Sequence, residues 1–428
     1  MNQKLHIISF DGLSKLDMDF LKTQPNFKRF LEGASYSFEV ESVYPTLTYP
    51  AHTSISTGNY PNKHGIVNNT LVQPYRRRPD WYWHESYIKT KTFQQLATEN
   101  GYSVLSLLWP VMGKAKIKYN MPEIFSNRVW SNQIMVSLKS GSKKFQIDLF
   151  KRFGSVLDGI KQPNLDTFTH NNYIYSLKNY KTDVTMVHYT DVDSTRHNFG
   201  FSSSEANKAL IRHDKRLGEI LDTIENLGDM ENTTIAILGD HSSLDNEKVI
   251  FLNTVFYNLG FIKLNKGRIV KWDLYAKEAG GSCYIYSKNN ISFEELRDIL
   301  KDHIDFKGIE KIYSSKEAKE LGADENCIMM LEGSRNYLFE DEIAPKAVMD
   351  IKELEVLDIT YHTNNHGYSP HLKKDYETVF MIKGNKIKKG INISKMNLVD
   401  EGPTFARILG LELKDVDGRV LEEILIGD

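Results

Sequence analysis

The fold is decided by the stretch LHIISFDG at residues 5–12 and by two similar stretches, VTMVHYTD at 184–191 and TTIAILGDH at 233–241. Each is a short apolar run that is followed by an acidic residue. Runs of this length, separated by segments with helical periodicity, are typical of strands in a parallel sheet that is covered on both faces. Ligands bind such sheets at the carboxyl ends of the strands, where these acids lie.

The segments between these stretches carry helix signals. Ser204 can cap a helix in which apolar residues between 210 and 227 repeat at helical spacing and which Gly228 can end. Residues 93–101 and 102–109 are likewise typical of a helix with a glycine stop and a strand. This alternation predicts an α/β protein with a doubly wound, mostly parallel sheet.

The middle of the chain has a different pattern. Residues 249–348 contain a helix-like run at 293–303 and strand-like runs at 282–286 and 327–331, whereas the C-terminal part resumes with a strand at 378–382 and a helix at 404–409. We therefore expect a core of residues 1–248 and 349–428, interrupted by a smaller α+β cap of residues 249–348. Residues 114–177 fit neither pattern.

Composition excludes several classes of protein. The chain has 428 residues with Lys+Arg 54 against Asp+Glu 56 and 40% hydrophobic residues, so it is neither disordered nor fibrous. Its net charge of -2 leaves no electrostatic footprint for a general nucleic-acid binder, and we expect no stable nucleic-acid partner. Only Cys283 and Cys327 are present, without a CxxC motif, so any metal must be held by His, Asp and Glu.

The start of the chain, MNQK, leads directly into the first apolar run, which is too short and polar for a signal peptide. No apolar run approaches the ~20 residues that a membrane span needs. We expect a cytoplasmic protein without a membrane span.

Three acids and three histidines form a candidate metal-binding set. Asp193 and His197 are four residues apart, so a helical turn would place them on one face. Taken singly, such residues are usually solvated surface pairs, helix caps or turn residues. Together they offer oxygen and nitrogen ligands for two Zn²⁺ or similar ions, which can hold the attacking and leaving oxygens of a phosphoryl transfer. The set is Asp11, Asp193, His197, Asp240, His241 and His366.

Candidate nucleophiles lie in the stretch YPTLTYPAHTSISTG at residues 44–58. Pro50 suits the first turn of a short helix and Gly58 suits its end, which places Thr48 at the amino end, where free N–H groups can hold a phosphate. Spacing alone does not separate Thr46, Thr48 and Ser54, and a plain helix cap is the alternative for Thr48.

The motifs follow one another in a specific order. They are Asp11-Gly12, Pro45-Thr46-Leu47-Thr48-Tyr49-Pro50, Thr57-Gly58-Asn59-Tyr60-Pro61, His64-Gly65-Ile66, Asn69, Trp109-Pro110, Asp193 to His197, Asp240-His241 and His366-Gly367-Tyr368. The order and spacing resemble the nucleotide pyrophosphatase/phosphodiesterase branch of the alkaline phosphatase superfamily, over nearly the whole chain.

The resemblance implies roles for these residues. Asp11, Thr48, Asp240 and His241 would bind one zinc ion, and Asp193, His197 and His366 would bind the second. Thr48 would be the nucleophile and would form a phosphothreonine intermediate, and Asn69 would donate a hydrogen bond to a non-bridging phosphate oxygen. The neutral Asn69 suits a monoanionic diester.

Three further features concern the substrate. Tyr49 occupies the family position beside a nucleobase, with core packing as the alternative. Arg196 replaces a usually small residue and would either contact phosphate or crowd out a nucleotide. Trp81, Tyr82 and Trp83, after three arginines at 76–78, either line a substrate rim or form an aromatic strand after a solvated charge run. Other departures from the family pattern are Ala51, Ser242-Ser243 and Ser369.

The sequence therefore predicts a metal-dependent hydrolase that cleaves phosphodiester or pyrophosphate bonds of small substrates. The nearest alternative is a phosphomonoesterase, phosphonate hydrolase or phosphomutase on the same scaffold. A rival of another class is a non-catalytic metal- or phosphate-ester-binding protein, although all seven predicted ligand positions carry suitable side chains.

Overall fold

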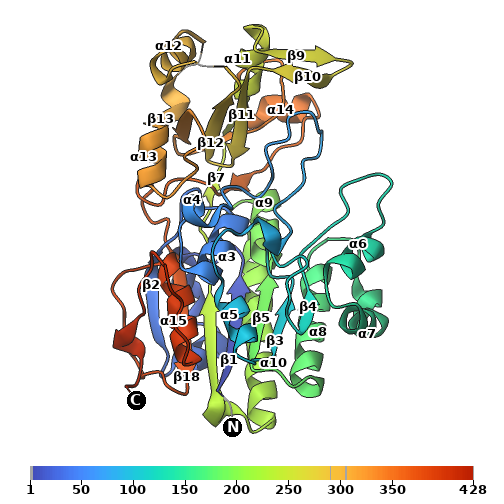
Figure 1. The fold of residues 1–428 in the computed structure, drawn as a ribbon, viewed down its shortest axis with the longest axis vertical. Coiled ribbons are helices and arrows are strands. Elements are labelled where there is room, and N and C mark those ends of the chain that lie inside the picture. The colour runs from blue at the N-terminus through green and yellow to red at the C-terminus, as the bar shows by residue number, and fades with distance from the viewer. Residues whose placement is uncertain (1–2, 290, 304–305, 428) are drawn as a thin grey trace.

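The structure is a computed structural model that describes residues 3–289, 291–303 and 306–427. Its centre is an eight-stranded sheet in the order β19-β2-β18-β6-β1-β5-β3-β4 (Figure 1). The strands are β1 (Lys4–Phe10), β2 (Ser35–Glu41), β3 (Val104–Leu107), β4 (Tyr119–Met121), β5 (Val184–Tyr189), β6 (Thr233–Leu238), β18 (Thr378–Gly384) and β19 (Met396–Asn397).

The three stretches that predicted the sheet are neighbours in it. β1 pairs in parallel with both β5 and β6, so the acids that follow these strands lie at one edge of the sheet. β18 pairs antiparallel with both β6 and β2, and the other pairings are parallel. The predicted mostly parallel sheet is confirmed.

Helices cover both faces of the sheet, as the alternation predicted. One face packs against α3 (Thr48–Thr57), α5 (Phe93–Glu99) and α15 (Glu401–Ile408). The other packs against α2 (Pro25–Leu31), α7 (Lys143–Phe153), α8 (Asn164–Asn179) and α10 (Ser204–Asn226). In β1, Leu5 and Ile7 belong to the first core and Ile8 and Phe10 to the second, because alternate residues of a strand face opposite sides. The other core helices are α1 (Met18–Leu21), α4 (Pro61–His64), α6 (Gln133–Ser140) and α9 (Asp191–Phe199).

Two local predictions were wrong. The cap of α10 is Ser203 instead of Ser204, because the Ser203 hydroxyl accepts a hydrogen bond from Ala206 N at 3.1 Å. The predicted strand at 102–109 is shorter, since Leu108 has φ 52 and leaves the extended conformation. Residues 114–177, which fitted no pattern, contribute β4, α6, α7 and α8.

Beyond the carboxyl edge of the large sheet lie smaller sheets and helices (Figure 1). A four-stranded antiparallel sheet has the order β11-β12-β14-β13, and a three-stranded sheet has the order β15-β8-β16. The predicted helix at 293–303 is confirmed, and the strand predicted at 327–331 spans 329–333. The predicted cap limits of 249 and 348 fall in the paired strands β8 and β16.

The elements of this part follow in chain order. They are β7 (Leu244–Asp245), β8 (Lys248–Ile250), α11 (Leu252–Asn258), β9 (Ile262–Asn265), β10 (Arg268–Trp272), β11 (Leu274–Ala279), β12 (Ser282–Ser287), α12 (Phe293–His303), β13 (Ile309–Ser314), α13 (Ser315–Glu320), β14 (Met329–Gly333), β15 (Tyr337–Phe339), β16 (Val348–Asp350), α14 (Ile351–Val356) and β17 (Asn364–Asn365).

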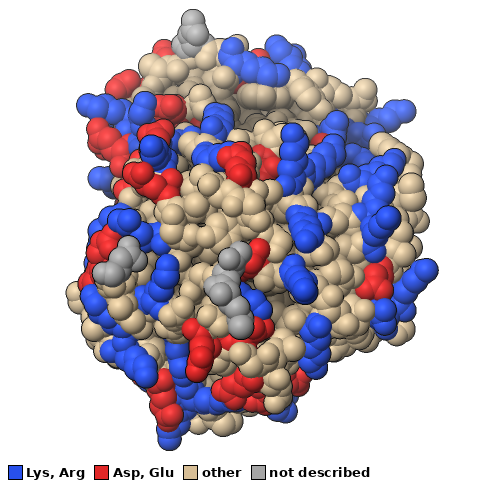
Figure 2. All heavy atoms as spheres, turned by 60° about the horizontal axis from the view of Figure 1, so that its bottom comes forward, with Lys and Arg blue, Asp and Glu red and all other residues tan. Residues whose placement is uncertain are grey.

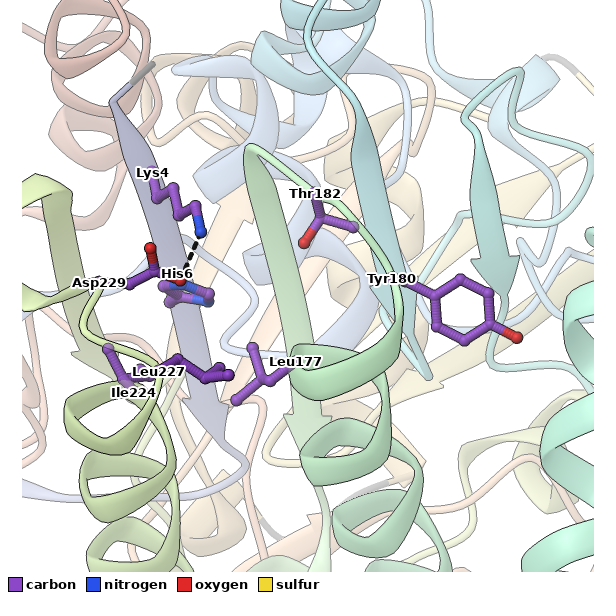
Figure 3. Close-up of a pocket in the computed structure, with 8 residues that line it drawn as sticks. All are labelled: Lys4, His6, Leu177, Tyr180, Thr182, Ile224, Leu227 and Asp229. Carbon is purple, nitrogen blue, oxygen red and sulfur yellow. Dashed lines mark hydrogen bonds and ion pairs between the residues drawn. The ribbon is translucent and has the colours of Figure 1, made fainter. Parts of the chain in front are cut away.

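A small polar cavity lies at the opposite, amino end of β1, between α8 and α10 (Figure 3). Its volume of about 20 Å³ has room for about one water molecule. His6 lines it beside the Lys4–Asp229 ion pair of 2.6 Å. Burial, followed by the charge of Lys4, lowers the pKa of His6 to about 3. This cavity is therefore a structural feature of the core, remote from the acidic edge.

The buried His6 predicts a pH-dependent stability. The unfolded chain binds a proton below pH about 6.5 and the folded chain does not, so stability falls as the pH drops from 6.5 towards 3. Lowering the pH from 7 to 5 should therefore reduce the free energy of unfolding by about 2 kcal/mol. Urea unfolding at both pH values should show that His6→Gln loses about 2 kcal/mol less than the wild type. The exposed His303→Gln control should behave as the wild type, and an unchanged pH slope in His6→Gln would contradict the prediction.

Candidate two-metal centre

The predicted acids and histidines meet at the carboxyl edge of the sheet in two groups. Within each group, one potential ligand atom per residue lies within 4.8 Å of the others. The first group is Asp11, Asp240 and His241, and the second is Asp193, His197 and His366. The first group follows β1 and β6, whereas the second combines α9, which follows β5, with the residue after β17.

The second group is oriented by backbone carbonyls. His197 Nε2 lies 3.2 Å from Asp193 Oδ2, and His197 Nδ1 bonds the Asn364 carbonyl at 2.7 Å. His366 Nε2 lies 3.8 Å from Asp193 Oδ1, and its Nδ1 bonds the Thr46 carbonyl at 2.9 Å. Each ring therefore presents Nε2 to the group, the arrangement in which histidine is held as a metal ligand.

The first group is fully buried and adjoins the second. His241 Nε2 lies 3.4 Å from Asp11 Oδ1 and 3.3 Å from Asp240 Oδ2. The His241 ring stacks on the His366 ring with 3.8 Å between centroids. The two groups are thus parts of one centre.

Thr48 lies at this centre. It is the first residue of α3, is 8% exposed, and its Oγ1 is 3.2 Å from His241 Nε2. The other two hydroxyls that the sequence left open have different partners. Thr46 Oγ1 accepts from Gly367 N and donates to the Tyr368 carbonyl, both at 2.9 Å, and Ser54 Oγ bonds His64 Nε2 at 2.9 Å.

The charges of the centre fit divalent cations. Burial, followed by the charges of Asp240 and Asp193, raises the pKa of Asp11 well above its usual value, and burial raises that of Asp240 to about 6. Among the described residues, Asp11 Oδ1 and Asp240 Oδ2 have no hydrogen-bond partner. Burial lowers the pKa of His241 to about 4, which keeps the ring neutral as a metal ligand must be. Bound cations would relieve the cost of burying these two carboxylate oxygens without a hydrogen bond.

Glycines allow the close approach of ligand-bearing segments. Gly12 has φ +70, and a Cβ there would lie 3.3 Å from Asp193 Cβ. Gly367 has φ +92, and a Cβ would lie 1.8 Å from the Ala279 carbonyl of β11. A side chain at either position would push a ligand-bearing segment away from its neighbour.

Asn69 lies beside Thr48. Its Oδ1 accepts a hydrogen bond from Tyr49 N at 2.9 Å, which leaves Nδ2 as the donor end of the side chain. This contact occupies the Tyr49 N–H, one of the helix N–H groups that were predicted to bind phosphate. Pro50, the next residue, has no N–H group. The amino end of α3 therefore offers fewer backbone donors than predicted, and the Asn69 amide provides a side-chain donor beside it.

Two residues for which the sequence suggested a substrate contact are buried in the structure. The Arg196 side chain is 1% exposed, because its guanidinium pairs with Asp17, donates to the Gly12 carbonyl at 2.7 Å and lies over the Phe201 ring. Arg196 thus holds α9 against the loop after β1. Tyr49 is 0% exposed, which favours the alternative of core packing over contact with a nucleobase.

The aromatic residues after the three arginines cover Tyr49. The Trp81 ring lies 5.1 Å from the Tyr49 ring and 5.1 Å from the Phe125 ring. Trp83 is 7% exposed and also packs against Phe125. Residues 81–83 form no named strand, and Trp81 makes an isolated bridge with Thr70.

Sequence reasoning missed three buried or half-buried histidines around the centre. His52 Nδ1 bonds the Thr48 carbonyl at 2.8 Å, and His188 Nε2 lies 3.3 Å from Asp11 Oδ2. The His362 ring lies 4.7 Å from the His197 ring. Spacing gave a signal for one of them, since His52 stands four residues from Thr48 on the same helix.

A buried carboxylate ties the small sheets to the centre. Glu332 of β14 is 0% exposed, accepts from Tyr44 OH at 2.8 Å and from Ser369 N at 3.0 Å, and pairs with Lys373 Nζ at 2.6 Å. These partners flank the segments that carry Thr48 and His366. Glu332 therefore fixes both segments relative to β14.

Removing the cation of this pair should destabilise the fold. Lys373→Met leaves Glu332 buried without its counter-charge, which typically costs about 3 kcal/mol or more. Chemical unfolding at pH 8 measures the loss. The matched control is Lys374→Met, whose side chain is 89% exposed and which should change stability by less than about 0.5 kcal/mol. Equal stabilities of the two variants would contradict the prediction.

A comparison with known protein families shows the family of this chain. Residues 5–369 match the family described as type I phosphodiesterase / nucleotide pyrophosphatase. The chain belongs to this family. The match includes all six acids and histidines of the centre, Thr48 and Asn69.

Curated phosphodiesterase relatives match at low identity. The human ectonucleotide pyrophosphatase/phosphodiesterase family member 1 is 25% identical over 256 residues, 57% of this chain and 24% of that protein. The bis(5'-adenosyl)-triphosphatase ENPP4 of Bos taurus is 22% identical over 433 residues, 96% of this chain and 78% of that protein. The chain thus spans about a quarter of the length of the first relative.

Solved phosphodiesterase-family structures share the fold. The human ectonucleotide pyrophosphatase/phosphodiesterase 5 superposes with a TM-score of 0.70 at 17% identity, over 99% of this chain and 100% of that chain. The murine protein gives 0.68 at 16% identity with the same coverage. The chain therefore has the alkaline phosphatase-like fold that the sequence predicted. Within the described residues, no helix is both long and apolar enough to cross a membrane.

Proposed function

We propose that this protein hydrolyses phosphodiester or pyrophosphate bonds of small phosphate esters, with two zinc ions held by its acid and histidine groups. The observation that carries the proposal is the position of Thr48 Oγ1, 3.2 Å from His241 Nε2 of the first group, whose ring stacks on that of His366 in the second. Asp11, Thr48, Asp240 and His241 would hold one ion, and Asp193, His197 and His366 the other. When bound, the ions would supply positive charge that lowers the pKa of a hydroxyl and stabilises a leaving oxygen.

The chain's own residues then account for the reaction. Thr48 Oγ1 forms a bond to phosphorus while the bond to the leaving alcohol or phosphate oxygen breaks, and the hydroxyl proton passes to that leaving oxygen, which gives a phosphothreonine. Asn69 Nδ2 donates to a non-bridging oxygen of the group in transfer. Water then displaces Thr48 from phosphorus and regenerates its hydroxyl.

Two observations on relatives support this assignment. The Bos taurus relative is a bis(5'-adenosyl)-triphosphatase by name, and a murine relative of the same fold has been solved as an inactive threonine-to-alanine variant in complex with AMP. Both names concern nucleotides. We extend this only to small phosphate esters, because Tyr49 is buried in this chain.

A comparison of substrates tests the proposal. With zinc added, bis(p-nitrophenyl) phosphate should be cleaved faster than p-nitrophenyl phosphate, because the uncharged Asn69 does not neutralise the second charge of a monoester. A clear preference for the monoester would favour the phosphomonoesterase alternative. A panel of dinucleotides, nucleotide sugars and glycerophosphodiesters would then identify the substrate class.

Asn69→Ala should lower kcat for a diester by roughly 10²- to 10³-fold, the usual effect of removing one oxyanion donor. Steady-state kinetics with bis(p-nitrophenyl) phosphate measure the change. Asn59→Ala is the control, since Asn59 bonds the Thr57 carbonyl at the far end of α3. Retention of full activity by Asn69→Ala would show that this amide does not serve the transition state.

A further inference from the structure

A surface outside the centre combines exposed apolar side chains with unpaired lysines. It is formed by residues 126–153, which include α6 and α7 at the β4 edge of the sheet (Figure 1). We name it the α6–α7 surface. Its exposed apolar residues are Val129 at 99%, Trp130 at 81%, Ile134 and Met135 at 50%, Phe150 at 44% and Ile147 at 41%.

Helical geometry places part of this set on one face of α7. Ile147 and Phe150 are three residues apart, and Lys143, Lys144 and Lys151 stand at helical spacing beside them. All five are exposed, whereas Phe145 and Leu149 are buried on the opposite side. The outward face of α7 is therefore a mixture of apolar and basic residues, an arrangement typical of helices that lie at a membrane surface.

The charge of this region differs from that of the chain. Residues 126–161 contain seven lysines and arginines and two aspartates, a net charge of +5, whereas the whole chain has -2. Among the described residues, Lys139, Lys143, Lys144 and Lys151 form no ion pair. α6 and α7 lie at the right of Figure 1. Along the right margin of Figure 2, basic residues outnumber acidic ones.

We propose that the α6–α7 surface docks on an anionic lipid bilayer. Val129 and Trp130 project from a turn and would insert their apolar side chains at the interface, where tryptophan is favoured. The unpaired lysines would contact acidic headgroups. A second copy of this chain fits poorly, because symmetric contact would bring two regions of like charge together.

Vesicle sedimentation of the full chain tests the docking. The protein should bind vesicles that contain about 30% phosphatidylglycerol and should not bind pure phosphatidylcholine. Raising the salt from about 0.05 M to about 0.5 M should release it, because the Debye length shortens. Its tryptophan emission should shift to the blue on binding. Absence of binding to the anionic vesicles at low salt would overturn the proposal.

Variants assign the binding to this surface. The triple variant Lys143→Glu, Lys144→Glu, Lys151→Glu should partition roughly a hundredfold more weakly, at about fivefold for each lysine lost. Trp130→Ser should lose the blue shift and part of the binding. Lys316→Glu with Lys374→Glu, and Val356→Ser, are controls on exposed positions elsewhere.

All variants should cleave bis(p-nitrophenyl) phosphate as the wild type does, which shows that they fold. Equal binding by the triple variant and the wild type would refute the assignment. A concentration-dependent dimer that Trp130→Ser abolishes, in a protein that does not bind vesicles, would replace the lipid with a second copy.

Discussion

Thr48→Ala should lower kcat for diester hydrolysis by roughly 10⁴- to 10⁶-fold, the range found when a catalytic nucleophile is removed. The reason is that the Thr48 hydroxyl lies at the first ligand group, 3.2 Å from His241 Nε2. Alanine keeps the helix start and removes only the hydroxyl and methyl groups. Single-turnover assays with a labelled diester should detect a phosphorylated wild type and an unlabelled variant.

Ser54→Ala is the matched control for Thr48→Ala. Ser54 lies in the same helix, and its hydroxyl is bonded to His64 instead of facing the centre. Its activity should stay within about tenfold of the wild type, with a loss of stability of about 1 kcal/mol. If Thr48→Ala retained full activity with an unchanged fold and metal content, Thr48 would not be the nucleophile.

Asp193→Asn should remove one of the two proposed metal ions and lower kcat by at least roughly 10³-fold. Asp193 contacts both His197 and His366, at 3.2 and 3.8 Å, so its loss leaves the second group with two neutral ligands. Substitution of residues that support metal ligands typically lowers metal affinity or activity about 10- to 100-fold, and loss of a ligand itself should lower them further. Elemental analysis should find about two zinc ions per wild-type chain and about one in the variant.

Two controls make this prediction specific. Asp148→Asn, on α7, should keep both metal content and activity, because Asp148 bonds Tyr180 and Arg152. A chelator should inactivate the wild type, and added zinc should restore it. Full zinc content in Asp193→Asn would exclude this group as a metal site.

The sequence predicted the parts of the fold that local patterns determine. The strands at 5–10, 184–189 and 233–238 were recognisable because buried parallel strands are continuous apolar runs. Their adjacency brought Asp11 and Asp240 together as expected. The pairing of Asp193 with His197 followed from helical spacing, whereas the contact of His366 with Thr46 depends on a turn far away in the chain.

Other features were beyond sequence reasoning because they depend on long-range packing. Arg196 was expected at the substrate, but its partner Asp17 is 179 residues away in the sequence. Tyr49 left two alternatives open, and only the position of Trp81 explains its burial. Residues 114–177 gave no pattern, since α6 and α7 expose apolar side chains where a surface helix usually has polar ones.

The position of β2 has a consequence for the order in which the protein is assembled. Both of its neighbours in the sheet, β18 and β19, come from the chain beyond residue 377, and β2 leads into the segment that carries Thr48. During synthesis the segment that carries Thr48 would therefore follow a strand, β2, that has no neighbour in the sheet until this late part of the chain has emerged. Long-range pairing of this kind is slow to form. Hydrolytic competence should accordingly be acquired at the end of folding, after β1, β5 and β6 have already associated.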